Sequence, residues 1–309
     1  MSCTTIESND ANIVGIDPDW PHSWWSIRPA SPLPNIAATG IGIFIDGYTQ
    51  TGASANTSAP GQDAVLRVEI DGSGIVAGVT NGLTIGAGTN TITGLIINRF
   101  VGDGNPGTGN GIGITSSDTI RGNFIGTDAS GTVDLGNAGS GIASSSGFSS
   151  NIGGSADADV NLISGNNADG ITLSNSNTNL ILGNLIGTRA NGTSGLGNGG
   201  AGISLTGLGS GFNTIGGENP GEGNTIAFNV ADGVSLTTAG TGNSIRGNSI
   251  FSNGTTSLHL GIDLGADGVT ANDAPASLDA DSRSKQPSEL PRDYAGAGDG
   301  KHQDDYRNA

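Results

Sequence analysis

The sequence has 309 residues, 56 of them glycine, and its formal net charge at pH 7 is −17. Up to Asp281 it contains six arginines and no lysine, so a nucleic-acid phosphate backbone would find little to pair with, and we expect no nucleic-acid partner. No apolar run is long enough to cross a membrane, and the single Cys3 cannot form an internal disulfide.

Residues 1–35 contain all three tryptophans and are rich in proline. We expect them to form an irregular N-terminal cap, because the open end of a repeat domain must be covered. An alternative is a carbohydrate-binding platform built from Trp24 and Trp25. Two less regular strands then follow, in "IFIDG" from Ile43 and in "VEIDG" from Val68.

Short apolar segments recur from residue 82 onward at a nearly constant period. They begin at Gly82, Gly111, Gly141, Gly170, Gly202, Gly233 and Gly261. Subtraction of successive positions gives intervals of 28 to 32 residues. Within an interval a second apolar segment follows, such as "NLILGN" from Asn179, and then a third, such as "LIGT" from Leu185. Each unit therefore predicts three short strands separated by turn residues.

Three strands per unit at this period stack most simply as rungs of a right-handed parallel β-helix, an all-β solenoid that we expect over residues 36–281. Equivalent strands would pair about 4.8 Å apart along the axis. A β-sandwich or a propeller is the alternative, but the period is too short for a four-stranded blade. Two inner rows of side chains follow from this register. They are Ile171, Ile203 and Val234 in one row and Ile181, Ile215 and Ile245 in the other.

Two segments are nearly identical: "GNFIGTDASGT" from Gly122 and "GNLIGTRANGT" from Gly183. The charged residue changes from Asp128 to Arg189, whereas the glycines, asparagine, isoleucine and threonine recur. This pattern favours architecture over catalysis. Asn123, Asn184 and Asn248 follow glycines at matching turns, where the asparagine amide can bond to neighbouring backbone or form ladders along the axis. We expect the "GTDASGT" and "GTRANGT" segments to be loops.

The motifs "IDGYTQTGAS", "RGNFIGTDASGT", "NTIGG" and "GIDLGADGVTANDA" resemble the large bacterial right-handed parallel β-helix repeat proteins, which are similar in shape to pectate lyases. The resemblance covers roughly residues 31–281. It implies a β-helix and an extracellular or cell-surface location, and it implies no reaction. The CSLREA motif of some members is absent here, and the first ten residues lack the basic and apolar regions of a signal peptide.

Residues 282–309 depart from this pattern. They hold five of the eleven basic residues, including both lysines, and lose the glycine–isoleucine rhythm. Our hypothesis is that a frameshift near Asp281 replaced the original continuation with an out-of-frame tail, which we expect to be disordered.

Four charged residues of the repeat region are candidates for catalysis. Arg121 and Arg246 occupy matching "IRGN" positions, but four rungs separate them by about 19 Å. Asp169 and Asp232 each precede the first strand of a unit, two rungs or about 10 Å apart. That is near the carboxylate spacing of inverting glycosidases. Aspartate before glycine is also ordinary turn chemistry, which we favour here.

A candidate metal site lies in "GIDLGADGVTANDAPASLDAD". The acidic residues of this segment are Asp263, Asp267, Asp273, Asp279 and Asp281, with Asn272 nearby. Oxygen ligands on a flexible loop are those that Ca²⁺ prefers. The spacing does not match the twelve-residue calcium-binding loop, and a solvated acidic loop without metal is the interpretation we favour.

These features predict a monomeric, non-catalytic rigid scaffold or carbohydrate-binding surface whose partner is an extracellular polysaccharide. The alternative is a polysaccharide lyase or glycoside hydrolase that uses Asp169 and Asp232. A third interpretation is an ice- or mineral-binding face made of Thr and Asn rows. We disfavour it because the outward residues Leu182 and Arg246 interrupt such rows.

Overall fold

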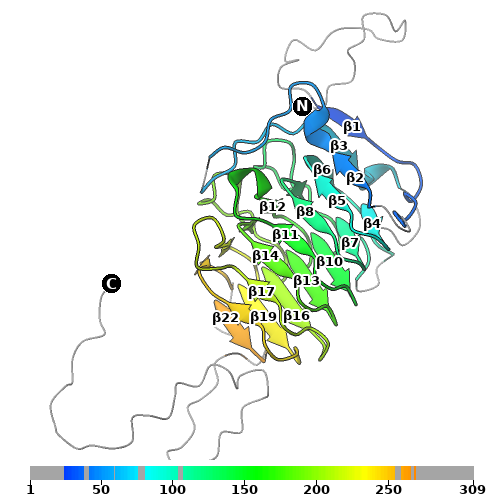
Figure 1. Ribbon diagram of the computed structural model, residues 1–309. Coiled ribbons are helices and arrows are strands. Elements are labelled where there is room, and N and C mark those ends of the chain that lie inside the picture. The colour runs from blue at the N-terminus through cyan, green and yellow to red at the C-terminus, as the bar shows by residue number, and fades with distance from the viewer. Residues whose placement is uncertain are drawn as a thin grey trace, which may run out of the picture.

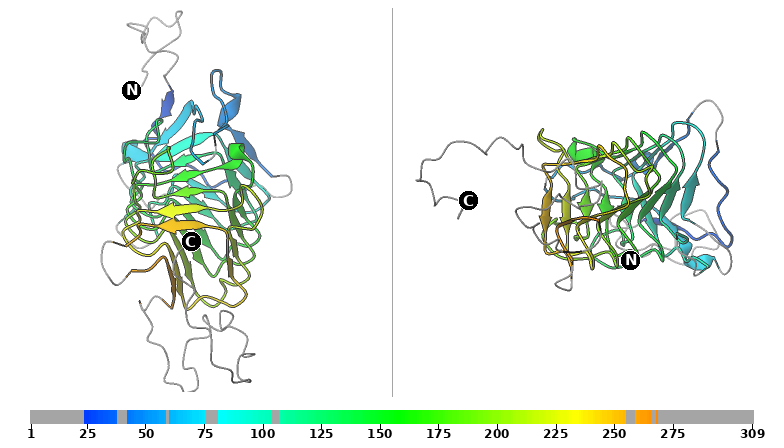
Figure 2. Two further views of the ribbon diagram at one scale, coloured as in Figure 1. Left: turned by 90° about the vertical axis from the view of Figure 1, so that its left-hand side faces the viewer. Right: turned by 90° about the horizontal axis from the view of Figure 1, so that it is seen from below.

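The computed structural model describes residues 24–37, 42–58, 60–75, 81–103, 107–254, 259–265 and 268. Within them, 22 strands form three parallel sheets that share one axis (Figure 1). Views from two further sides show successive turns of the chain side by side along this axis (Figure 2). The predicted right-handed parallel β-helix is confirmed.

The three sheets are named in the order in which a unit of the chain visits them. The first sheet contains β4 (Leu83–Ile85), β7 (Ile112–Ile114), β10 (Ile142–Ser145), β13 (Ile171–Ser174), β16 (Ile203–Thr206), β19 (Val234–Thr237) and β22 (Ile262–Leu264). The second contains β2 (Phe44–Asp46), β5 (Thr91–Thr93), β8 (Thr119–Arg121), β11 (Asn151–Gly153), β14 (Leu180–Leu182), β17 (Thr214–Ile215) and β20 (Ser244–Ile245). The third contains β1 (Trp25–Ile27), β3 (Val68–Asp71), β6 (Leu95–Asn98), β9 (Phe124–Ile125), β12 (Leu162–Ile163), β15 (Leu185–Ile186), β18 (Thr225–Ala227) and β21 (Ser249–Phe251).

A rung is one strand from each sheet in succession, for example β13, β14 and β15. The predicted register is correct: Ile171 pairs with Ile203 and Ile203 with Val234. The second predicted row, through Ile215, is also correct. These side chains face the interior and form one continuous core along the axis. Because burial of each such side chain stabilises the fold by roughly 1.5–3 kcal/mol, every rung adds a similar increment.

The N-terminal end of the solenoid is built from strands that arrive out of the regular order. β1 pairs with β3 and extends the third sheet, and β2 pairs with β5 and extends the second. Ile36 forms an isolated parallel bridge with Ile85 at the edge of the first sheet. The expected cap of residues 1–35 thus includes one regular strand. Residues 1–23 and the predicted tail 282–309 lie outside the described residues, so the domain boundaries stay a prediction.

Ladders of polar side chains run along all three corners between the sheets. The corner between the first and second sheets carries Asn90, Asp118, Ser150, Asn179, Asn213 and Asn243. The second-to-third corner carries Asn123, Asn161, Asn184, Asn224 and Asn248. The third-to-first corner carries Asn137, Asn166, Asn198, Asn229 and Asn253. The predicted ladder through Asn123, Asn184 and Asn248 is confirmed, and two more accompany it.

One ladder asparagine shows how a buried amide is accommodated. The backbone N–H and the Nδ2 of Asn184 both donate to Oδ1 of Asn224 in the next rung, each at 2.9 Å. Nδ2 also donates to the carbonyl of Ile152 in the preceding rung at 2.9 Å. Asn184 is fully buried, and an unpaired amide there would cost about 1–3 kcal/mol. The ladder removes this cost.

The two similar segments occupy equivalent corners two rungs apart. Gly122 and Gly183 adopt φ of 63° and 65°, and an added Cβ at Gly183 would lie 2.2 Å from the Gly154 carbonyl oxygen. Ile125 and Ile186 face the core. The recurring residues are therefore those that the corner geometry requires.

The two loops that follow these segments explain why the charged residue changes. In the first, Asp128 accepts hydrogen bonds from the backbone of Thr132 and Val133. In the second, Asn191 accepts from Thr193 and Ser194 instead. The stabilising acceptor has moved along the loop, so its charge is dispensable.

We predict that Asn198→Ala lowers the free energy of unfolding by about 3 kcal/mol, because it leaves the buried backbone N–H of Asn166 without an acceptor and removes the side-chain hydrogen bonds to Asn166 Nδ2 and Asn229 Oδ1. Asn253→Ala, at the last described step of the same ladder, should cost less, because Asn253 is half-exposed and water can replace part of its hydrogen bonds. Urea unfolding followed by circular dichroism measures both. Equal losses for the two variants would contradict a cooperative ladder.

We predict that Gly183→Ala is more destabilising than Gly107→Ala, although both glycines have positive φ. Strain alone costs each variant about 1 kcal/mol. An added Cβ at Gly107 meets nothing within 4 Å, whereas at Gly183 it collides with backbone. We expect a loss above about 3 kcal/mol at Gly183 in thermal and urea unfolding. If the two variants unfold alike, the contact between neighbouring corners is not limiting.

Candidate functional site

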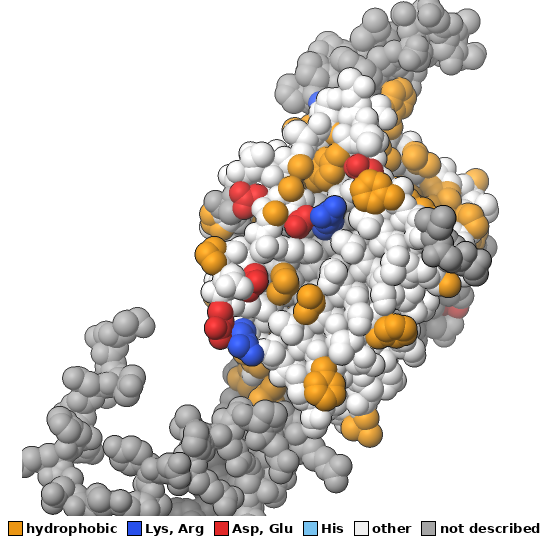
Figure 3. Space-filling view, viewed as in Figure 1, with side chains coloured by type: hydrophobic (Ala, Val, Ile, Leu, Met, Phe, Trp, Pro, Cys, Tyr) orange, Lys and Arg blue, Asp and Glu red, His pale blue; other side chains and the backbone are white. Residues whose placement is uncertain are grey.

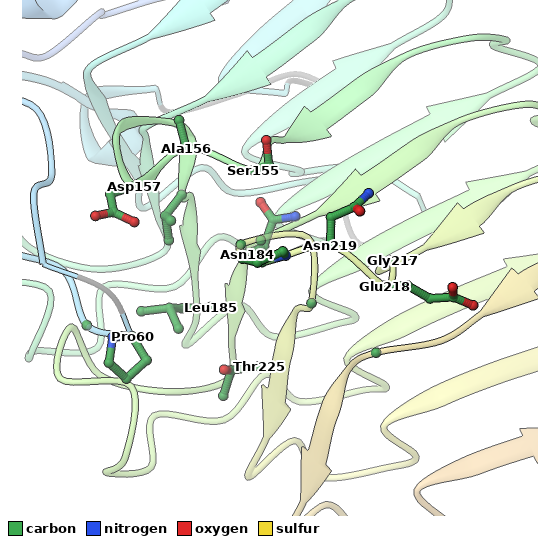
Figure 4. A pocket seen from close by; sticks show the side chains of 17 residues that line it. Pro60, Ser155, Ala156, Asp157, Asn184, Leu185, Gly217, Glu218, Asn219 and Thr225 are labelled. Carbon is green, nitrogen blue, oxygen red and sulfur yellow. The ribbon is translucent and has the colours of Figure 1, made fainter.

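A groove of about 640 Å³ lies on the outer side of the third sheet (Figure 4). Leu185 of β15 and Thr225 of β18 form its floor. Residues 60–61 form one wall, and two turns, at 155–157 and 217–221, form the other. These segments are far apart in the sequence and meet because the solenoid stacks them.

The turns exist because the second-to-third corner alternates in length. Successive ladder asparagines at this corner are 38, 23, 40 and 24 residues apart, from Asn123 to Asn248. The ladder is kept at every rung, so the extra residues project outward. The short corner at Gly183 thus lies between two long turns, and a hollow one rung wide results. These spacings are visible in the sequence, but the groove was not predicted from them.

The two long turns are in direct contact. A Cβ added at Gly221 would lie 2.1 Å from the Ser155 carbonyl oxygen. The short corner between the turns is tied to the second one, because the backbone N–H of Gly183 donates to the carbonyl of Glu222 at 3.1 Å. Within the second turn, Glu222 accepts from the side chain and the backbone of Asn219 at 2.8 and 3.0 Å. These hydrogen bonds hold the pKa of Glu222 below its usual range. These contacts hold the wall formed by the two turns in place without a ligand.

The opposite wall belongs to a strap, defined here as residues 54–66. Its ends meet at an antiparallel bridge between Ser54 and Val65. Asn56 Nδ2 donates to the carbonyl of Asp157 at 3.0 Å, and the Gln62 N–H donates to the carbonyl of Ala190 at 2.7 Å. The strap covers an apolar row on the outer face of the third sheet. Leu66 at the end of the strap packs with Ile96, Phe124, Leu162, Leu185 and Ala190, and these six residues are called the outer cluster.

Trp24 and Trp25 do not form a common platform. The Trp24 indole packs against the outer cluster and donates to Glu69 at 2.9 Å. Trp25 is in register with Val68 and Leu95, whose side chains pack in the inner core. Neighbouring residues of an extended segment point to opposite sides, so the two rings cannot stack on one ligand.

The charged side chains of the groove are Asp157 and Glu218. Figure 4 shows them at opposite ends of the groove, pointing away from each other. Glu218 forms an exposed ion pair with Arg246 at 3.0 Å. The two carboxylates do not converge on a common point, as a pair of hydrolytic acids would.

Asp169 and Asp232 use their carboxylates within the scaffold. Asp169 accepts from the backbone N–H of Ala201 at 2.8 Å and from the Thr172 hydroxyl at 2.9 Å. Asp232 accepts from the N–H of Leu260 at 2.6 Å, and its Oδ1 lies 3.4 Å from His259 Nδ1. Each aspartate thus holds the equivalent residue of the next rung, which favours the turn interpretation.

Arg121 and Arg246 lie four rungs apart on the second sheet, as predicted. Arg121 pairs with Asp159 at 3.1 Å and Arg246 with Glu218 at 3.0 Å. On the face shown in Figure 3 the basic side chains lie next to acidic ones. Their separation prevents the two arginines from acting on one substrate group.

The predicted calcium site falls mostly outside the described residues, since Asp267, Asp273 and Asp279 lie there. Asp263 on β22 is buried and accepts from Gly268 N–H at 2.9 Å. Its Oδ1 has no hydrogen-bond partner among the described residues. Among the described residues, no three His, Cys, Asp or Glu side chains are placed to hold a metal. A calcium site around Asp263 stays a prediction.

The residues that interrupt hydroxyl rows on the second sheet have no effect on the first sheet. Leu182 and Arg246 belong to the second sheet or its corner and cannot interrupt rows on the first. The outward row of the first sheet runs through Thr172, Ser204 and Ser235 in direct register. Much of the face in Figure 3 carries no charged side chain.

Comparison with known proteins gives no family for this chain. No protein-family model matches it, and no curated protein is significantly similar to it. In the described part of the chain, no helix is long and apolar enough to span a membrane.

We predict that Asp169→Asn reduces the pH dependence of stability. Burial raises the pKa of Asp169, although hydrogen bonds from Ala201 and Thr172 oppose this. The folded state therefore binds this proton more tightly than the unfolded chain does, and the group's contribution to stability falls as pH rises above about 4. The variant should gain stability relative to the native protein between pH 4 and pH 7 in urea unfolding. A difference that is constant across this range would contradict the assignment.

Proposed function

We propose that this β-helix is a non-catalytic extracellular or cell-surface scaffold that binds polysaccharide in the groove. The single observation that carries the proposal is a braced hollow that combines apolar patches with free hydroxyl groups. Pro60 and Val160 offer apolar surface, and the hydroxyls of Ser155 and Thr225 have no hydrogen-bond partner among the described residues. Sugar rings present both C–H faces and hydroxyl groups, and they match such a lining.

Rigidity also supports a binding role. The floor of the groove consists of strands fixed by parallel pairing on both sides, and its long wall is braced by hydrogen bonds within the second turn and from the Gly183 corner to Glu222. A preformed site loses little conformational entropy when a ligand binds. The volume lies within the range of small-ligand pockets and would hold a short stretch of a polymer.

The enzyme alternative requires two carboxylates, or an arginine with a cation, that converge on one substrate bond. Asp169 and Asp232 are held by backbone N–H groups of neighbouring rungs, and Asp157 and Glu218 diverge. These contacts favour binding without cleavage.

The extracellular setting and membership of the bacterial β-helix repeat proteins are part of the same proposal. The glycine-rich motifs support them, as does an acidic sequence that is lysine-free up to Asp281. A monomer is expected because each rung already buries its own apolar face within the solenoid.

We predict that the purified protein is retained on at least one immobilised extracellular polysaccharide and that Thr225→Trp abolishes retention. The indole would fill the floor of the groove. Thr214→Trp is the matched control, since Thr214 is also a half-exposed, outward residue of the same rung but lies on the second sheet. It should bind like the native protein. Retention that survives Thr225→Trp would place the binding surface elsewhere.

The same samples distinguish binding from catalysis. Incubation of the polymers, with and without calcium, should release no new reducing or unsaturated ends. New ends that disappear in Asp169→Ala or Asp232→Ala would replace this proposal with the enzyme alternative.

A further inference from the structure

We infer that the groove selects uncharged glycans and excludes polyanionic ones, and that Asp157 sets this preference; the inference rests on the proposed function. The charged side chains that line the groove are both acidic. An anionic polymer would bring its carboxylates or sulfates close to these groups without gaining a cationic partner. Like charges in contact disfavour such binding, whereas hydroxyl groups of a neutral glycan are unaffected.

The two acidic groups are not equivalent. Glu218 is compensated by Arg246, whose Nη1 lies 3.0 Å from its carboxylate. The Asp157 carboxylate has no hydrogen-bond or ion-pair partner in the described part of the chain, although its backbone carbonyl is bonded to Asn56. Asp157 therefore carries the uncompensated negative charge of the groove. Substitution of one member of the Glu218–Arg246 pair would leave the charge of the other member uncompensated.

A cation is the other occupant that an acidic groove could take. Calcium requires six to eight oxygens, usually with several carboxylates among them. Here one carboxylate is free, the second is paired with arginine, and they point to opposite ends of the groove (Figure 4). Within the described ranges no acidic trio is placed to hold a metal. The arrangement therefore favours a neutral polyhydroxyl ligand.

The test uses one polymer backbone in two charge states. The neutral polysaccharide that the native protein retains is compared with its carboxymethylated derivative, by retention at low salt. We expect the neutral form to be retained at least about tenfold more strongly. The ratio should approach one at high salt, because surface charge effects are screened over a few ångströms there.

A series of charge variants gives the sign of the effect. Asp157→Asn should lower the neutral-to-anionic ratio about fivefold and leave retention of the neutral polymer unchanged. Glu218→Gln frees Arg246 and should lower the ratio too, whereas Arg246→Gln frees Glu218 and should raise it. Asp103→Asn is the control, because it removes one exposed acid near the β4–β6 rung, remote from the groove; its ratio should match the native one.

Each outcome decides between the proposals. If the native protein retains no polymer, both the proposed function and this inference fail. If it retains the anionic form equally well, or if Asp157→Asn leaves the ratio unchanged, binding stands and the inference is wrong. Calcium binding that Asp157→Asn removes, measured by calorimetry without polymer, would instead make the groove a cation site.

Discussion

The corner ladders are the interaction on which the rest of the structure depends. A chain with so little charge and so much glycine can stack its short strands only if the backbone turns sharply three times per rung. At each turn some amide groups become buried without strand partners. The side chains of Asn184, Asn198 and Asn213 provide the missing partners. The Nδ2 of each donates to the side chain of the next rung and to a backbone carbonyl of an earlier rung. Core burial then adds stability to a register that hydrogen bonds have already fixed.

Because the ladder fixes only the corner residue, the chain between two ladder positions is free in length. The solenoid absorbs insertions outside the core without disturbing the stack, and the long turns at 155–157 and 217–221 are such insertions. The strap over the outer cluster is another. The groove is the space that these outward segments leave between them. Its shape depends on corner lengths, and its rigidity depends on the ladder beneath.

The difference between the regular stack and the outward segments of variable length explains what could be predicted from sequence. The period of glycine and isoleucine is local, so the strands and the stack of Ile171 on Ile203 followed from it. Asn184 was recognisable as a ladder residue because glycine precedes it, as glycine also precedes Asn123 and Asn248. The ladder through Asn166 was not predicted, although glycine precedes three of its five asparagines, and Asp118 and Ser150 replace asparagine at another corner. The groove could not be predicted, since residues 60–61 reach turns almost a hundred residues away only through the fold.

The ladders also change how acidic residues in such a chain should be interpreted. Asp169 and Asp232 lie near turns and were candidates for chemistry, yet each accepts a backbone N–H from a neighbouring rung, as the ladder residue Asp118 does. A carboxylate engaged in this way cannot move toward a substrate without breaking the stack, and its loss would appear first as instability. The Asp157 carboxylate does not hold a neighbouring rung in this way, because its turn lies outside the ladder. In a β-helix, the acids able to influence a ligand are those that the corners do not use.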